Sequence, residues 1–140
     1  MSKKSEKITA LIESCRGQEL PAHYLGYFEC FNRGLFYEAH DVLEELWLPN
    51  RSGSNGPFYK GLIQFTGAFV HFQKGRLGPA AALLRLAQAN LQKYPAIHDR
   101  LAVNDVLALI GQWLERLETH GSNGNPLSSE TAPRLALLDR

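Results

Sequence analysis

The sequence predicts an all-α fold, a compact bundle of about five helices built from two stacked helical hairpins and a closing helix. Three observations lead to this prediction. Apolar residues recur with helical spacing along most of the 140-residue chain, and the apolar/polar alternation typical of strands is nearly absent. Proline and glycine also divide the chain into segments of helical length.

Two main helices are expected in the first third of the chain. The charged first twenty residues favour at most one loose helix, over about residues 6–15. A longer helix should begin near Pro21, because proline suits a first turn, and end at the turn "NRG", residues 32–34. The next helix covers about residues 36–48, and Pro49 is expected to end it.

Three more helices are expected after the loop "NRSGSNG", residues 50–56. Pro57 opens the first of these, which continues to about residue 74. Glycines at 75 and 78 interrupt the chain, and Pro79 then opens a helix that ends near residue 93. Asn104 or Asp105 caps the last helix, whose apolar positions reach residue 117.

The chain is therefore expected to have three parts. These are a polar N-terminal extension over residues 1–20, a helical bundle domain over residues 21–119, and a linker with a C-terminal tail over residues 120–140. The linker prediction rests on the composition of "GSNGNP", which follows His120.

The bundle contains a faint internal repeat. The segments "FNRGLFYEAHDVLEEL" and "FQKGRLGPAAALLRLA" place Phe31 in register with Phe72 and Gly34 with Gly75, with a period of forty-one residues. Each copy would be one helical hairpin. Each glycine is expected to adopt the left-handed conformation that ends a helix and turns the chain.

Composition excludes several classes of protein. A net charge of +1 gives no reason to expect a nucleic-acid partner. The longest uncharged run, residues 61–73, is too short to span a membrane, and the basic start "MSKKSEK" is not followed by a secretory signal. Cys15 and Cys30 are too few for a disulfide framework, so both are predicted to be thiols in the cytoplasm.

The helix over residues 36–48 carries the first group of candidate site residues. His40 and Glu44 lie one turn apart on one border of its apolar face, Trp47 follows on the same edge, and Glu38 lies on the other border. Asp41 lies opposite the apolar face and is expected to be solvated, as is Glu45.

The helix over residues 57–74 carries the second group. It is apolar nearly all round, which predicts a central, buried helix. A narrow polar stripe nevertheless runs along it, consisting of Lys60, Gln64, Gly67 and His71. The stripe could face solvent, or it could face His40 and Glu44 across a helix pair, in which case Gly67 would allow close approach or leave room for a ligand.

Three kinds of site are compatible with these residues. His40, Glu44 and His71 could bind a divalent metal such as zinc or iron, although no HExxH motif is present. Alternatively, Glu44 could orient His40 and favour its protonated form for acid–base work, while Lys60 binds an anionic group. The third possibility is a structural network in which the polar groups satisfy one another.

The function classes left open are correspondingly broad. The leading hypothesis is a small binding or catalytic domain with a pocket formed by His40, Glu44, Lys60 and His71 and lined by Glu38, Trp47, Gln64 and Gly67. The rival hypothesis is an interaction or structural module with no chemistry of its own. Self-association is compatible with either, and no reaction is indicated. His23, His98 and His120 are expected at the surface.

The same segments resemble the small all-helical bacterial family known as domain of unknown function 309. The resemblance covers roughly residues 28–91 and rests on "FNRGLFYEAHDVLEELW", which contains the motif Glu-Ala-His-x-x-x-Glu-x-x-Trp, and on "FYKGLIQFTGAFVHFQKG". The positions that fit the family pattern are Gly34, Glu38, Ala39, His40, Glu44, Trp47, Lys60, Gly61, Gln64 and His71. Asp41 stands where the pattern more often has Glu, and Lys60 where Gln is also usual. The resemblance implies a helical bundle with its site near His40, Glu44 and His71, and it supplies no reaction.

Overall fold

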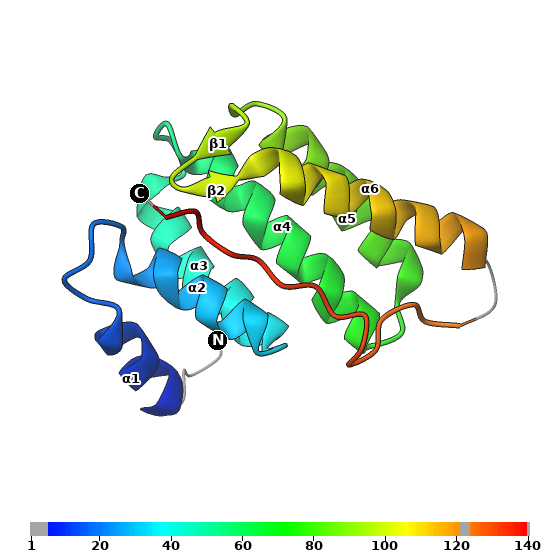
Figure 1. The fold of residues 1–140 in the computed structure, drawn as a ribbon, viewed down its shortest axis with the longest axis horizontal. Coiled ribbons are helices and arrows are strands. Elements are labelled where there is room, and N and C mark those ends of the chain that lie inside the picture. Colours follow the sequence, from blue (N-terminus) through cyan, green and yellow to red (C-terminus); the bar gives the residue numbers. More distant parts are fainter. Residues whose placement is uncertain (1–5, 121–123, 140) are drawn as a thin grey trace.

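The computed structural model describes residues 6–120 and 124–139, and its fold is all-α apart from one very small sheet (Figure 1). The elements in these residues are α1 (Glu6–Ser14), α2 (Ala22–Asn32), α3 (Phe36–Asn50), α4 (Gly56–Gln73), α5 (Leu77–Leu91), β1 (Ile97–His98), β2 (Leu101–Ala102) and α6 (Val103–His120). The predicted all-α class is confirmed. The described residues contain six helices, where about five were expected, and the shortest of them is α1.

Helix α4 lies at the centre of the bundle and is buried on most sides, as its composition predicts (Figure 1). It packs against α3 on one side and against α5 on the other, while α2 packs on α3 and α6 on α5. Aromatic rings fill the space between these helices. Phe65 stacks on Phe31 with ring centroids 5.5 Å apart, and Phe69 meets Trp113 edge-on at 5.1 Å.

The turns after α2 and α4 have the same geometry, as the internal repeat predicts. Gly34 and Gly75 adopt positive φ values of 75° and 72°. In each turn the glycine N–H donates to the carbonyl of the preceding phenylalanine, Phe31 or Phe72, over 3.0 Å. The expected left-handed conformation is therefore confirmed at both positions.

Two features of the chain path differ from the predictions. Pro49 lies inside α3, which continues to Asn50. Proline removes the backbone donor to the Glu45 carbonyl, and the cost is small here because the residue lies one position from the helix end. Helix α5 begins at Leu77, two residues before Pro79, so this proline occupies its first turn.

A sheet was not expected, but β1 and β2 form a two-stranded antiparallel hairpin of four residues. Its two turn residues, Asp99 and Arg100, have φ values of 47° and 62°, a conformation that non-glycine residues seldom adopt. Strands of two residues carry no alternation that a sequence could reveal. The tail extends this sheet through an isolated bridge between Leu101 and Leu137.

Both ends of the described chain pack on the helices. The side chains of Ile8 and Ile12 bury α1 against the core. The tail crosses the front of the molecule (red in Figure 1) and pairs with α2, because the Asn32 side chain donates to the Leu135 carbonyl over 2.6 Å and accepts from its N–H over 2.7 Å.

Residues 121–123, in the predicted linker, lie outside the described residues, and the three-part division of the chain stays a prediction.

The core contains one buried polar contact between α2 and α4. The Tyr27 hydroxyl lies 2.7 Å from Thr66 Oγ1, and Thr66 also donates to the Leu62 carbonyl over 2.9 Å. Both side chains are fully buried, so each hydroxyl needs this partner. No helix in the described residues is long and apolar enough to cross a membrane.

The two turn glycines provide a test of the fold. Gly34→Ala and Gly75→Ala should each lower the free energy of unfolding by about 1 kcal/mol, because a Cβ makes the left-handed conformation unfavourable. No described atom lies within 4 Å of either added Cβ, so the effect is conformational. Gly111→Ala in α6, which also meets no described atom within 4 Å, should instead stabilise by about 0.5–1 kcal/mol. Urea denaturation measures all three, and a stabilising effect at position 34 or 75 would contradict the assignment.

Candidate functional site

Two pairs of the predicted site residues meet where α3 and α4 pack, namely His40 with Gly67 and Trp47 with Lys60. A Cβ added to Gly67 would lie 3.8 Å from His40 Cδ2 on α3 and 3.1 Å from Leu83 Cδ1 on α5. The imidazole of His40 therefore lies against the α4 backbone, at the line where α3 and α5 both approach α4. We call His40 and Trp47 of α3, with Lys60, Gln64, Gly67 and His71 of α4, the polar seam.

Lys60 and Trp47 form a second contact across the seam. The ammonium nitrogen of Lys60 lies 4.4 Å from the centroid of the Trp47 ring, a cation–π geometry between two partly buried side chains. Lys60 makes no ion pair with the described residues, so its N–H donors remain free for an anion. From Trp47 to His40, and from Lys60 to Gly67, the distance is about two helical turns, or about 10 Å.

The ring of His40 is enclosed on its Nδ1 side. Nδ1 is buried and makes no hydrogen bond, although the Oδ1 of Asp41 lies 3.5 Å away. The Asp41 side chain is only 23% exposed, so the expectation that it is solvated was wrong. Asp41 thus takes the position beside His40 that the sequence assigned to Glu44, which makes no hydrogen bond or ion pair with the described residues.

His71 and Gln64 differ in how their polar atoms are satisfied. The Nδ1 of His71 is buried without a hydrogen-bond partner. Desolvation, with smaller contributions from Arg76 and Lys74, lowers the pKa of His71 below its ordinary value of 6.5. Gln64 instead turns toward α5, where its Oε1 accepts a hydrogen bond of 2.7 Å from the Asn90 side chain. Gln64 therefore has a structural partner, and His71 has none among the described residues.

The metal option is not supported by the arrangement of these residues. Within residues 6–120 and 124–139, no three His, Cys, Asp or Glu side chains are grouped so that they could hold a metal ion. His40, Glu44 and His71 are consequently not brought together as a ligand set. Glu38, on the other border of α3, lies near Cys30, whose pKa rises to about 11 because of burial first and this carboxylate second.

The remaining histidines are in different surroundings. His98 is half-buried, and its Nε2 lies 2.7 Å from the side-chain oxygen of Asn55. The side-chain nitrogen of Asn55 donates to the Asp99 carboxylate over 2.9 Å. This network ties the β hairpin to the start of α4, and the sequence did not reveal it because its members lie 43 and 44 positions apart. His23 lies 3.4 Å from Glu45 and is 31% exposed. The side chain of His120 lies outside the described residues.

Two surface cavities lie away from the seam. One of about 500 Å³ lies between the ends of α2 and α4 and the tail, and one of about 570 Å³ lies between α1, α2 and the tail. None of the seam residues lines either of them. Asn32 and Arg33 line both, and sequence reasoning missed them because the cavity walls come from segments about a hundred positions apart.

Comparison with known proteins gives a match to a family model over part of the chain, and no function. Residues 24–83 match the model of the family described as Domain of unknown function (DUF309), which confirms the resemblance over that range. All residues of the polar seam fall inside the match, whereas the tail falls outside it. No curated protein and no solved structure matches the chain.

The environment of His71 predicts a pH dependence. Because its folded pKa is lowered, the unfolded chain binds a proton at a higher pH than the folded chain does, and stability from this residue is lost as pH falls below 6.5. A proton NMR titration should give His71 a midpoint below 6.5. In His71→Gln the free energy of unfolding should fall less between pH 7 and the acid range than it does in the wild type. A midpoint at or above 6.5 would rule out desolvation as the dominant effect.

Proposed function

We propose that the polar seam, which lies within residues 24–83, is a binding site for a small anionic ligand. In this proposal His40 exchanges or shares a proton with the ligand. The observation that carries this proposal is the position of the His40 ring against Gly67 with its Nδ1 enclosed. The remaining nitrogen, Nε2, makes no hydrogen bond with the described residues and is available to a ligand.

The chemistry of His40 supports an acid–base role. Its Nδ1 lies beside the Asp41 carboxylate at 3.5 Å, and a carboxylate on one side of an imidazole favours the tautomer with its proton on that nitrogen. Nε2 is then a lone-pair acceptor, which is the form that a general base requires. Asp41 would act as a positioning residue in this scheme.

The other end of the seam supports an anionic ligand. Lys60 is held over the Trp47 ring at 4.4 Å, which fixes the position of its charge while leaving its N–H donors free. The span of about two turns, or about 10 Å, between this cation and His40 suits an extended molecule with a charged end.

The unsatisfied nitrogens weigh against a purely structural network. In such a network both ring nitrogens of a buried histidine would find protein partners, because an unpaired buried polar group costs about 1–3 kcal/mol. Tyr27 and Thr66 show this arrangement elsewhere in the same bundle, with each hydroxyl paired. The Nδ1 atoms of His40 and His71 are buried without such partners, and a catalytic role is one of the explanations for an unsatisfied buried polar group.

We also propose that the bundle is two stacked hairpins, α2–α3 and α4–α5, closed by α6. Support comes from the matched turns at Gly34 and Gly75 and from the forty-one-residue register, which pairs buried residues with buried residues. Phe31 and Phe72 are both fully buried, as are Ala39 and Ala80. In this scheme the seam lies where the two hairpins meet.

Comparison of His40→Ala with His23→Ala tests the proposed site. The two histidines are matched controls, because they are 29% and 31% exposed and lie 3.5 Å and 3.4 Å from a carboxylate. His40→Ala should leave the melting temperature unchanged or raise it, since functional sites often sacrifice stability. It should also abolish the thermal stabilisation that wild type and His23→Ala gain from members of a panel of small carboxylates and phosphates. Lys60→Met should weaken the same stabilisation.

Two outcomes would count against the proposal. A loss of about 1–3 kcal/mol in His40→Ala, with no compound stabilising the wild type, would assign His40 to a structural network. Stoichiometric zinc, iron or manganese, found by elemental analysis of protein purified without added metal or a metal-capturing tag, would instead favour the metal option.

A further inference from the structure

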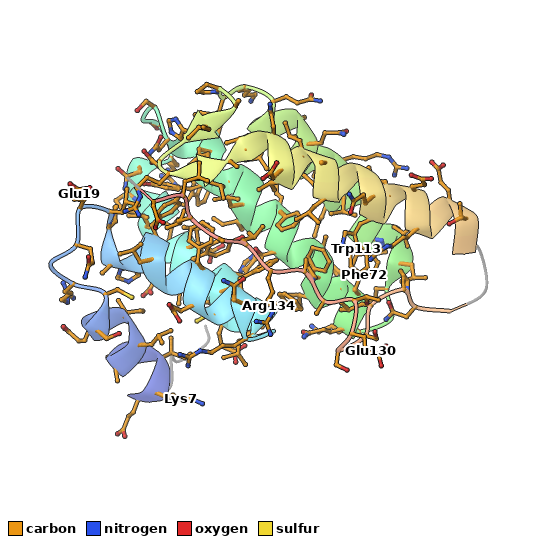
Figure 2. All side chains as sticks on the ribbon, in the orientation of Figure 1. Lys7, Glu19, Phe72, Trp113, Glu130 and Arg134 are labelled. Carbon is orange, nitrogen blue, oxygen red and sulfur yellow. The ribbon has the colours of Figure 1, made fainter. Side chains whose placement is uncertain are left out.

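A second candidate site lies where the tail passes over the C-terminal ends of α2 and α4. The cavity of about 500 Å³ has walls from three segments, namely residues 32–36, residues 72–73 and residues 125–134. Its volume is within the range that small-molecule sites occupy, about 300–1,000 Å³. Figure 2 shows Arg134 on the tail as it passes between α2 and the end of α4 marked by Phe72.

The charge in this cavity is positive. Arg33 and Arg134 line it, and no described Asp or Glu does. Arg33 lies 3.6 Å from Glu29, with side chains 49% and 54% exposed, a pair that solvent weakens. Arg134 makes no hydrogen bond or ion pair with the described residues, so its guanidinium is free to bind.

The negative ends of the two helices do not offset this charge. Carbonyl groups at a helix C-terminus carry partial negative charge and would repel an anion. Here the Gln73 side chain donates to the Gly34 carbonyl over 3.2 Å, and the Asn125 side chain donates to the Phe72 carbonyl. These amides satisfy two of the carbonyls at this edge of the cavity, which reduces the repulsion of an anion.

Part of the cavity wall is apolar. Leu127 and Ala132 of the tail line it and are partly exposed, whereas Phe36 and Phe72 beneath it are 2% and 0% exposed. Such a wall suits a ligand with an aromatic or aliphatic group, while a guanidinium recognises a planar carboxylate or a phosphate through paired hydrogen bonds.

We propose that this cavity binds a small organic anion, a carboxylate or phosphate attached to an aromatic or apolar group. Arg33 and Arg134 bind the anionic end, and Leu127 and Ala132 contact the apolar end. The site is separate from the polar seam and does not depend on it. It is also completed by the tail, which lies outside the family match, so Arg134 adds a binding function to the part of the chain that the family shares.

Benzoate, phenyl phosphate and neutral benzyl alcohol test this proposal, each titrated into the ¹⁵N-labelled full chain and followed by amide chemical shifts. At least one of the two anions should produce saturable shifts at Gly34, Gln73 and the 125–134 segment, and benzyl alcohol should not. Arg134→Gln should weaken anion binding about tenfold, the effect expected for losing one charge-assisted hydrogen-bonded contact. Arg85→Gln, which removes an exposed arginine of α5 outside the cavity, should leave the affinity unchanged.

Comparison of the two anions, and of a second arginine variant, distinguishes the possible ligands. Binding of benzoate alone assigns a carboxylate ligand, binding of phenyl phosphate alone assigns a phosphate, and both support the shared chemistry. Arg33→Gln should repeat the effect of Arg134→Gln, and the melting temperatures of all variants verify that they are folded. No saturable shift with either anion, equal affinity in both arginine variants and wild type, or binding lost in Lys60→Met but kept in Arg134→Gln would each overturn the proposal. The last result would leave the seam proposal standing.

Discussion

The burial of α4 is the constraint on which the rest of the structure depends. A helix that is apolar on nearly every side is stable in water only when other helices cover it, and α2, α3, α5 and α6 with the tail do so. Glycines in α4 set how closely its neighbours approach. A Cβ added to Gly61 would lie 2.9 Å from Leu91 on α5, so this glycine is required for the tight α4–α5 contact.

Because α4 is buried, each polar side chain on it must have a structural partner or another reason to be there. A buried helix can carry a polar side chain only at a cost, unless a partner satisfies it. Thr66 and Gln64 have such partners in Tyr27 and Asn90, and they hold α4 in register with α2 and α5. The histidines of the seam are the exceptions. An imidazole that packs against the backbone at Gly67 without a partner for its Nδ1 contributes little to register.

Much of this architecture could be predicted from the sequence, because local rules decide it. Proline and glycine mark the helix ends, the all-round apolar pattern identifies α4, and glycine at positions 34 and 75 specifies left-handed turns. The seam could be predicted as a possibility, since periodicity places His40 and Gly67 on particular faces but does not say which faces meet. The position of Asp41 beside His40 depends on side-chain rotamers, which a helical wheel does not contain.

The features that could not be predicted depend on contacts between distant parts of the chain. The hairpin at residues 97–102 has strands too short for any periodicity, and its turn uses Asp99 and Arg100 where glycine or asparagine would be expected. Both cavities depend on the path of the tail, which no local signal encodes. Pro49 shows the opposite case, in which a strong local signal is overridden at the last residues of a helix.

The two hydrogen bonds between the Asn32 side chain and the Leu135 backbone have a consequence for the order of folding. They close a loop of 103 positions, and the entropy lost on closing so long a loop is recovered only when both ends already have structure to pack on. Local contacts within α2, α3, α4 and α5 form over far shorter separations and do not have this requirement. We therefore expect the tail to dock last and to detach first, with the bundle core native while the wall that carries Arg134 is still open to solvent.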